Sequence, residues 1–141
     1  MATFTLFNSF SGKLGDGTID LDTHTFKCAL TNVAPVATNT VLADITQIAA
    51  GNGYSTGGVT LTNVVYTEPS AGEWSWDSDN IFFTATGGTM ATFRYLVIYD
   101  DTSASDNLVG YYDAGSQSLP DGLEFEFKVN ANGHILATKS P

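Results

Sequence analysis

The chain has 141 residues, of which 43% are hydrophobic and 14% are charged. This composition suits one domain over residues 1–141 and leaves little room for a second core. Lys and Arg number 5 against 15 Asp and Glu, which gives a formal net charge of -10 and disfavours nucleic acid and anionic lipid as partners. We also expect no membrane span and no secretion signal, because long apolar runs and a cationic N-terminus are missing.

Cysteine and histidine are too few for several kinds of site. Cys28 is the single cysteine, so no internal disulfide can form, and the two histidines cannot complete a structural zinc site with one thiol. His24 and His134 lie in turn-like sequences without a recognisable Ser or Cys nucleophile nearby. We therefore expect neither catalysis nor a cofactor.

The N-terminal 14 residues carry large apolar side chains at spacings of three and four, at Phe4, Phe7, Phe10 and Leu14. This spacing predicts a short amphipathic helix with the apolar residues on one side. The alternative is an extended anchoring arm, because Thr and Ser are mediocre helix formers and glycines follow. Either form presents aromatic side chains to a partner or to the domain's own core.

The next segment predicts a strand pair over 17–21 and 25–31, with Cys28 on the buried face. Apolar residues at helical spacing then predict about two helical turns over 42–49. Residues 51–58, GNGYSTGG, contain four glycines and no adjacent Lys, which favours a flexible loop over a phosphate-binding loop. Flexible loops of this kind often contact partners.

The remainder alternates short β-type segments with turn sequences. A regular strand is expected over 59–66, closed by Pro69. Further strands are expected over 73–76, 81–86, 92–99, 108–112, 123–129 and 134–138. Many short strands with few helices predict an all-β, mainly antiparallel fold, specifically a jelly-roll-like β sandwich with one or two short helices.

Two acidic clusters offer oxygen atoms at close spacing, as calcium sites do. They are Asp16, Asp20 and Asp22, and Asp77, Asp79 and Asn80. Neither cluster is followed by the bidentate Glu of an EF-hand, and Asp beside Gly or Ser commonly starts a turn. We interpret both clusters as turns and expect no metal.

Trp74 and Trp76 lie two residues apart on an expected strand, so both indoles should project from the same face. That face is either core or a contact surface. Paired indoles also stack on sugars, which keeps a carbohydrate-binding domain open as an alternative.

Two stretches in the first half of the chain resemble a known group of proteins. They are GTIDLDT followed by TFKCAL, at 17–23 and 25–30, and GNGYSTGGVTL at 51–61. Both are similar to stretches of small virion structural proteins of tailed bacteriophages, several of which are capsid decoration, or cement, proteins. The motifs hold turns and strands rather than a catalytic apparatus.

The resemblance implies a noncatalytic protein, made in the host cytoplasm, that binds the capsid exterior as a homotrimer and stabilises contacts between major capsid protein subunits. We expect the capsid or subunit contacts at Phe4, Leu6, Phe7, Phe10, Tyr54, Trp74 and Trp76. A tail or baseplate component and a carbohydrate-binding accessory domain remain alternatives. The N-terminal aromatics also suit closure of the domain's own sandwich.

Overall fold

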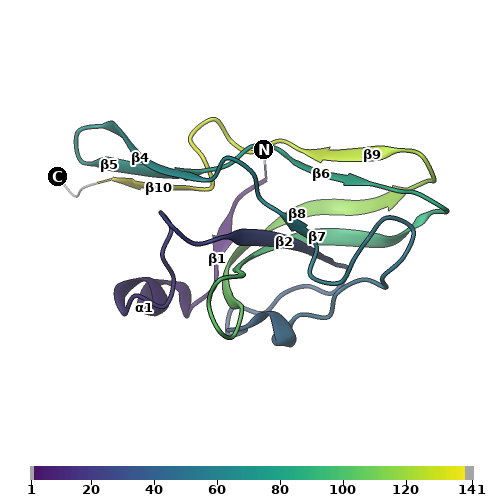
Figure 1. The fold of residues 1–141 in the computed structure, drawn as a ribbon, viewed down its shortest axis with the longest axis horizontal. Coiled ribbons are helices and arrows are strands. Elements are labelled where there is room, and N and C mark those ends of the chain that lie inside the picture. Colours follow the sequence, from purple (N-terminus) through teal and green to yellow (C-terminus); the bar gives the residue numbers. More distant parts are fainter. Residues whose placement is uncertain (1, 139–141) are drawn as a thin grey trace.

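The computed structural model describes residues 2–138, and within them the chain is mainly antiparallel β with one short α-helix. Figure 1 shows two layers of strands, one above the other. The lower layer is a five-stranded sheet with the order β1-β8-β7-β2-β3. Its strands are β1 (Thr5–Leu6), β8 (Asn107–Leu119), β7 (Met90–Asp100), β2 (Phe26–Thr31) and β3 (Val59–Thr60).

The upper layer contains two smaller sheets. A three-stranded sheet has the order β10-β5-β4, and a two-stranded sheet pairs β6 with β9. Their bounds are β10 (Ile135–Thr138), β5 (Glu73–Asp77), β4 (Val65–Ser70), β6 (Ile81–Thr84) and β9 (Glu124–Phe127). Figure 1 shows the three-stranded sheet projecting past the end of the lower layer, and we call it the β wing.

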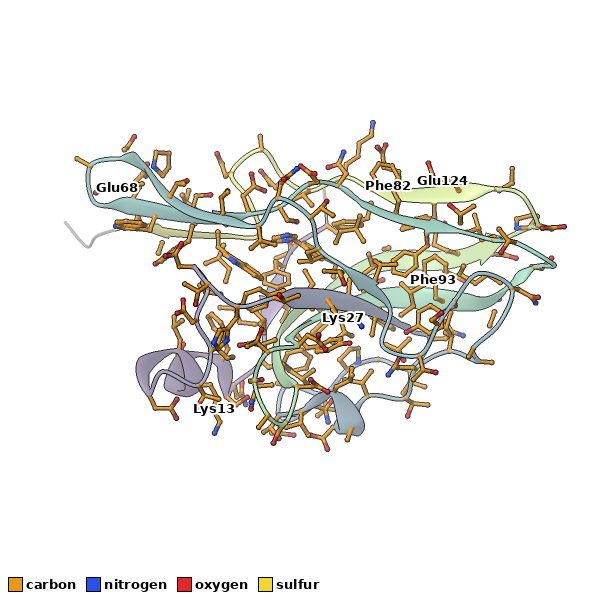
Figure 2. The ribbon with its side chains drawn as sticks, viewed as in Figure 1. Lys13, Lys27, Glu68, Phe82, Phe93 and Glu124 are labelled. Carbon is orange, nitrogen blue, oxygen red and sulfur yellow. The ribbon has the colours of Figure 1, made fainter. Side chains whose placement is uncertain are left out.

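The main hydrophobic core lies between the layers, where Phe26, Trp76 and Phe93 are fully buried. Figure 2 shows Phe93 between the layers and Phe82 on the outer side of the upper one. A second cluster forms on the outer face of the five-stranded sheet, where Phe7 and Ile45 pack on sheet residues. The five-stranded sheet is therefore covered on both faces. We call this sheet, together with the apolar clusters on its two faces, the body of the domain.

The mainly antiparallel β fold is confirmed, and the strands expected between residue 73 and residue 138 are all present with small shifts of their ends, except that the strand expected over 108–112 extends to Leu119. Among the described residues none of the three sheets closes into a barrel. The strand order does not show a jelly-roll connectivity, so that part of the expectation stays a prediction.

The expected N-terminal helix is wrong in extent. Phe4 and Phe7 flank strand β1, and the helix α1 (Phe10–Gly15) begins only after them. The phenylalanines therefore do not share one helical face: Phe7 packs on the outer side of the five-stranded sheet and Phe10 joins the main core.

Two further expectations fail because backbone groups bond to other partners, a side chain in the first case and a distant strand in the second. Residues 17–21 form turns rather than a strand, since Asp20 accepts hydrogen bonds from the backbone N–H groups of Asp22 and Thr23. Residues 42–49 form only the short 3-10 helix η1 (Leu42–Asp44). Beyond it, the chain bonds to the sheet edge, where the Ile48 N–H donates to the Leu30 carbonyl.

The expected strand over 59–66 divides into β3 and β4 at a kink. Asn63 has φ 50°, a left-handed conformation that Asn tolerates and that ends a strand. Pro69 does not close the second half but lies within β4, at an edge of its sheet next to a register shift. An edge position suits proline because no ladder partner needs its missing N–H.

Candidate contact surface

The N-terminal aromatic residues lie mostly inside the domain. Phe7 and Phe10 are buried, and the Phe4 ring packs 4.7 Å from the ring centre of Tyr112. Gly110 makes this possible, since a Cβ there would lie 2.5 Å from the Phe4 ring. Of the four N-terminal contact candidates, Leu6 alone is exposed, so the structure favours the interpretation in which the aromatics close the domain's own core.

Tyr54 is also buried, and the glycine-rich loop around it is held by specific contacts. The Tyr54 hydroxyl donates to Gln47 Oε1 at 2.6 Å and accepts from the Leu30 N–H at 3.1 Å. Burial raises the pKa of Tyr54 to about 12. Gly58 has φ 78° and a Cβ there would lie 1.7 Å from the Cys28 carbonyl oxygen, so the glycine permits close packing on β2. This buried position does not favour a surface role for Tyr54.

The two tryptophans of β5 have different surroundings although they share a face. Trp76 is 0% exposed, donates its indole N–H to the Leu21 carbonyl, and packs edge-on against Phe26. Trp74 is 40% exposed and contacts Tyr66, with ring centres 5.0 Å apart. The strand carries Trp76 over the body and Trp74 out along the β wing, so Trp74 is the tryptophan that a partner can reach.

The other face of the β wing also exposes apolar side chains. Val65 is 44% exposed and Leu136 is 41% exposed, and both line a shallow pocket of about 200 Å³ with Thr67 and Pro69. Cross-strand pairing shows which side chains share a face. Leu136 pairs with Ser75, so these two lie on one face, whereas Trp74 pairs with Ala137, so these two lie on the other. The wing thus presents apolar surface on both sides.

A buried polar cluster joins the wing to the body at the start of β10. The imidazole of His134 lies 2.8 Å from Ser78 Oγ through Nε2 and 2.6 Å from the Tyr112 hydroxyl through Nδ1. Burial raises the pKa of Tyr112, which therefore keeps its proton. The same desolvation lowers the pKa of His134 to about 4, so the imidazole is neutral near pH 7.

One arrangement of protons satisfies this whole cluster. The Tyr112 hydroxyl donates to Nδ1 of His134, the Nε2–H donates to Ser78, and the Ser78 hydroxyl donates to the Asp79 carbonyl at 2.9 Å. In this tautomer His134 has no free lone pair to take the Ser78 proton, as a general base for a serine nucleophile must. The geometry ties β10 to β8 and gives no activated serine.

The second histidine braces a loop. His24 Nδ1 lies 2.6 Å from the carboxylate of buried Asp100, which also accepts from the N–H groups of Thr102 and Ser103. The Ser103 hydroxyl donates to the Asp100 carbonyl rather than to His24. These bonds fix the turn after β7.

The acidic clusters behave as turn formers. Asp16 accepts from the Thr18 N–H, and Asp79 accepts from the side chains of Thr62 and Asn63. Hydrogen bonding to Thr18 lowers the pKa of Asp16. Within residues 2–138 no group of three His, Cys, Asp or Glu side chains is arranged to hold a metal ion. No α-helix in that range has the length and apolar character to cross a bilayer.

The exposed residues Val65, Phe82 and Leu136 were not among the sequence candidates. One signal pointed to Phe82: in the strand IFFT three apolar residues follow one another, so alternation must turn one of them outward. No comparable signal marked Val65 and Leu136, because the sequence does not show that the β wing extends beyond the body.

The candidate contact surface therefore consists of the β wing, with Trp74 on one face and Val65 and Leu136 on the other, together with the separate exposed side chain of Leu6. Aromatic and aliphatic side chains in such positions can bury area against a partner without any chemical step. Comparisons with protein-family models, with curated proteins and with solved structures found no match.

Proposed function

We propose that this protein is a noncatalytic structural component of a tailed-phage virion that binds the outside of the capsid and stabilises contacts between major capsid protein subunits. The observation that carries the proposal is the β wing, which projects from a closed body and exposes Trp74, Val65 and Leu136. The resemblance of residues 17–30 and 51–61 to small virion proteins supports the same role.

The body and the wing divide the work in a way that suits a cement protein. The body has apolar clusters on both faces of the five-stranded sheet, so its large apolar side chains there are already buried in the free chain. The wing offers apolar area that becomes buried only when another surface covers it. Each buried large apolar side chain contributes about 1.5 to 3 kcal/mol, which is enough for a modest individual contact.

Assembly as a trimer strengthens such contacts. Three linked copies bind one shell with an avidity well above the affinity of a single copy. Binding that favours the expanded shell stabilises that state by mass action. The net charge of -10 per chain also makes the DNA-filled interior an unfavourable location and supports the exterior.

Undecorated, expanded capsids provide the test. We expect the purified protein to sediment with them and to raise their melting temperature. The variant Trp74→Ala with Leu136→Ala should bind at least about tenfold more weakly, because it removes apolar area from both faces of the wing. The matched control is Val36→Ala, which truncates an apolar side chain that is more exposed than Trp74 and Leu136 but lies in the loop before η1.

The expected pattern is strong binding by the native chain and by the Val36 control, and weak binding by the double variant. Shells that bind the protein fully without gaining stability would contradict the proposed role. Labelling confined to tails in assembled particles would place the protein in the tail or baseplate instead.

A second candidate function is carbohydrate binding. The Trp74 and Tyr66 rings form an exposed aromatic pair with planes inclined at 44°, and indole faces stack on sugars. Glycan binding that Trp74→Ala abolishes, in a protein with no affinity for capsids, would favour this alternative.

A further inference from the structure

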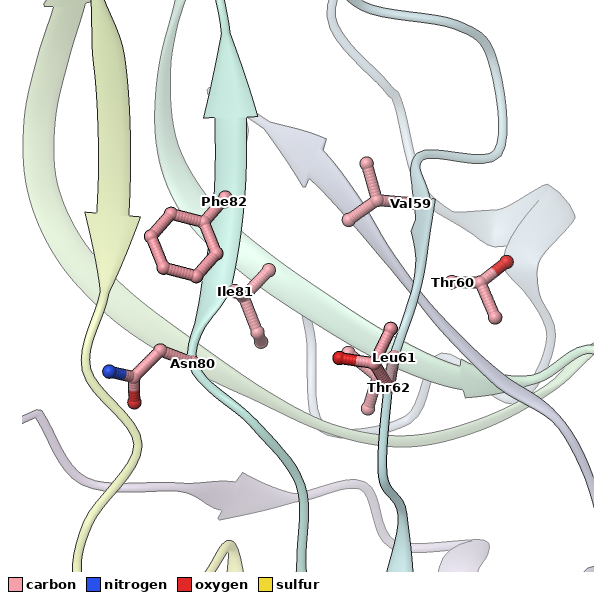
Figure 3. A pocket seen from close by; sticks show the side chains of 7 residues that line it. All are labelled: Val59, Thr60, Leu61, Thr62, Asn80, Ile81 and Phe82. Carbon is pink, nitrogen blue, oxygen red and sulfur yellow. The ribbon is translucent and has the colours of Figure 1, made fainter.

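A groove lies between the two layers of strands, at an edge of the domain where no further strand follows in either layer. It has a volume of about 210 Å³ and is lined by residues 59–62 from one segment and residues 80–82 from the other. Figure 3 shows these two segments running side by side, with Phe82 on the strand β6 and Val59 at the start of the opposite segment. The β wing does not contribute to it.

The groove originates where a long hairpin splits. Strands β4 and β5 pair as far as Val65 and Asp77, and the two segments then separate, one to join β2 and the other to join β9. The split is braced by Asp79, whose N–H donates to the Thr62 carbonyl and whose carboxylate accepts from Thr62 and Asn63. Beyond this brace the segments do not pair with each other.

The edge of β6 presents unpaired backbone groups to the groove. The Ala85 N–H donates to Leu123 and the Ala85 carbonyl accepts from Gly122, so both backbone groups of Ala85 face the β9 side. In an antiparallel ladder this direction alternates, so Ile81 and Phe83 also face β9. The N–H and the carbonyl of Phe82, between them, point to the open edge.

The opposite edge has the same character. The Leu61 N–H donates to the Phe26 carbonyl, which directs Leu61 toward β2. By the same alternation the N–H and the carbonyl of Thr60 point away from β2. This direction agrees with Thr62, two residues on, whose carbonyl accepts from Asp79 on the groove side. Thr60 and Phe82 therefore hold free hydrogen-bonding groups on the two sides of one groove.

The side chains that line the groove indicate which kind of segment could bind in it. Phe82 is 42% exposed, and Leu61 and Ile81 provide buried apolar surface below it. An extended segment with an apolar side chain would pair through its backbone and cover this surface, as in β-strand addition.

The charges nearby indicate the character of that segment. Glu126 pairs with Phe82 across the ladder, Glu124 contacts Thr84, and Asp79 lies at the split. In the described part of the chain these three carboxylates form no salt bridge, and they outnumber the two cations close to them in the ladders, Lys27, which pairs with Thr60, and Lys128, two residues after Glu126. The electrostatic complement is a segment that carries Lys or Arg.

We infer that this groove binds an extended, apolar segment with basic residues from a partner polypeptide, which adds as a strand between Thr60 and Phe82. The inference deepens the proposed function and rests on it for the partner, which is then a segment of the major capsid protein. The β wing and this groove would form two separate contacts with the shell.

Amide hydrogen exchange of the free protein tests the geometry first. The amides of Thr60 and Phe82 should exchange fast, while those of Leu61, Ile81 and Phe83 should be protected by their ladder partners. On addition of undecorated shells, the Thr60 and Phe82 amides should become protected. Slow exchange of both in the free protein would show that the edges are already paired and would overturn the inference.

A peptide titration tests the binding chemistry. The probe is a peptide of about eight residues that alternates valine with lysine and threonine. It should shift the amide resonances of residues 59–62 and 80–82, and the same peptide with glutamate in place of lysine, or with a methylated backbone, should not. Absence of shifts at millimolar peptide, or equal shifts with the methylated control, would overturn the inference.

Two variants test the groove within the full chain. Thr60→Pro removes an N–H that β2 does not use, and proline is tolerated at a sheet edge. Phe82→Thr removes the exposed ring but keeps a β-forming residue. Each variant should bind the lysine-containing peptide about tenfold or more weakly, whereas Val36→Thr, outside the groove, should bind it as the native chain does. Circular dichroism and melting of each variant identify any that fails to fold.

The shell experiment separates this inference from the proposed function. Native protein that binds shells, together with variants that bind them equally well, would overturn the groove contact while leaving the capsid role intact. Peptide binding that depends on Thr60 and Phe82, in a protein with no affinity for shells, would support strand addition while contradicting the capsid role. Loss of both peptide and shell binding in the variants supports both.

Discussion

The body and the β wing both consist of antiparallel strands, but the two regions differ in how far their side chains are buried. Strand β2 in the body is buried along almost its whole length, whereas strand β4 in the wing is exposed at five of its six residues. The contrast is sharpest within β5, where Trp76 is fully buried over the body and Trp74, two residues earlier, is 40% exposed on the wing.

This difference indicates that the projecting part of the wing, around Trp74, contributes less to the stability of the domain than the part over the body, around Trp76. The body has apolar clusters on both faces of its central sheet, while the wing leaves apolar area uncovered on both of its faces. A protein that retains such area in a projecting sheet has surface available for a partner.

The largest expected effect comes from the two tryptophans. Trp76→Ala should lower the free energy of unfolding by about 3–5 kcal/mol, because it leaves a cavity and removes the hydrogen bond to Leu21. Trp74→Ala should lower it by less than about 1 kcal/mol. Urea denaturation of both variants measures the difference, and equal losses would mean that the wing is as integral to stability as the body.

The second effect is a dependence on pH at the junction of wing and body. The pKa of His134 is about 4 in the folded state and 6.5 in the unfolded chain. Between these values the unfolded state binds more protons, so stability falls as the pH is lowered from 6.5 to 4. The total loss is about 3 kcal/mol.

Chemical denaturation at a series of pH values measures this slope. The variant His134→Gln removes the titrating group and should flatten the slope in that window, whatever its overall stability. The carboxylates with lowered pKa, such as Asp16 and Asp20, act below this window. Desolvation raises the pKa of Asp106, which gives a slope of the opposite sign at the acid end of the window, and this contribution is the same in the native chain and in the variant. A slope that persists in the variant would show that another group titrates at the junction.

A smaller effect is expected from two tyrosine hydroxyls. Tyr54→Phe leaves the buried Leu30 N–H without its partner, whereas Gln47 Oε1 still accepts from the Gly57 N–H, and the change should cost about 1–2 kcal/mol. Tyr66→Phe on the wing is the matched control and should change the unfolding free energy little, because its ring contributes through contact with Trp74. Thermal melting compares the pair, and a larger loss for Tyr66 would reverse the assignment.

The smallest effect should come from the ion pair of Arg94 and Asp113. The two side chains form a bidentate contact at 2.9 and 3.0 Å. Each stabilises the charged form of the other, so the pKa of Asp113 is lowered and the pKa of Arg94 is raised. Both are nearly half exposed, so solvent screens the attraction. A double-mutant cycle to alanine should give the smallest coupling of the set, decreasing further with salt, and a coupling that salt leaves unchanged would contradict the screened pair.

The sequence predicted most of the strands but not their arrangement. Alternation located β5, β7 and β10, and it placed Cys28 on the buried face, where the thiol lies. It failed where backbone groups bond to side chains or to distant strands, as at Asp20 and Ile48. Such competition depends on tertiary contacts that periodicity does not encode.

The candidate site was harder to predict for a related reason. Aromatic residues attract attention in either role, and only the fold separates buried Phe7, Tyr54 and Trp76 from exposed Trp74. The groove beside Phe82 depends on a kink at Asn63 that divides one expected strand into two. A local conformation of this kind changes which strand edges remain open.

The most direct test of the adhesive role is a reconstruction of undecorated, expanded capsids incubated with the protein. We expect density for the protein on the outer surface, with the β wing contacting more than one capsid subunit and the bodies related by a three-fold axis. Bare shells, or density in which Trp74 and Leu136 face solvent, would contradict it.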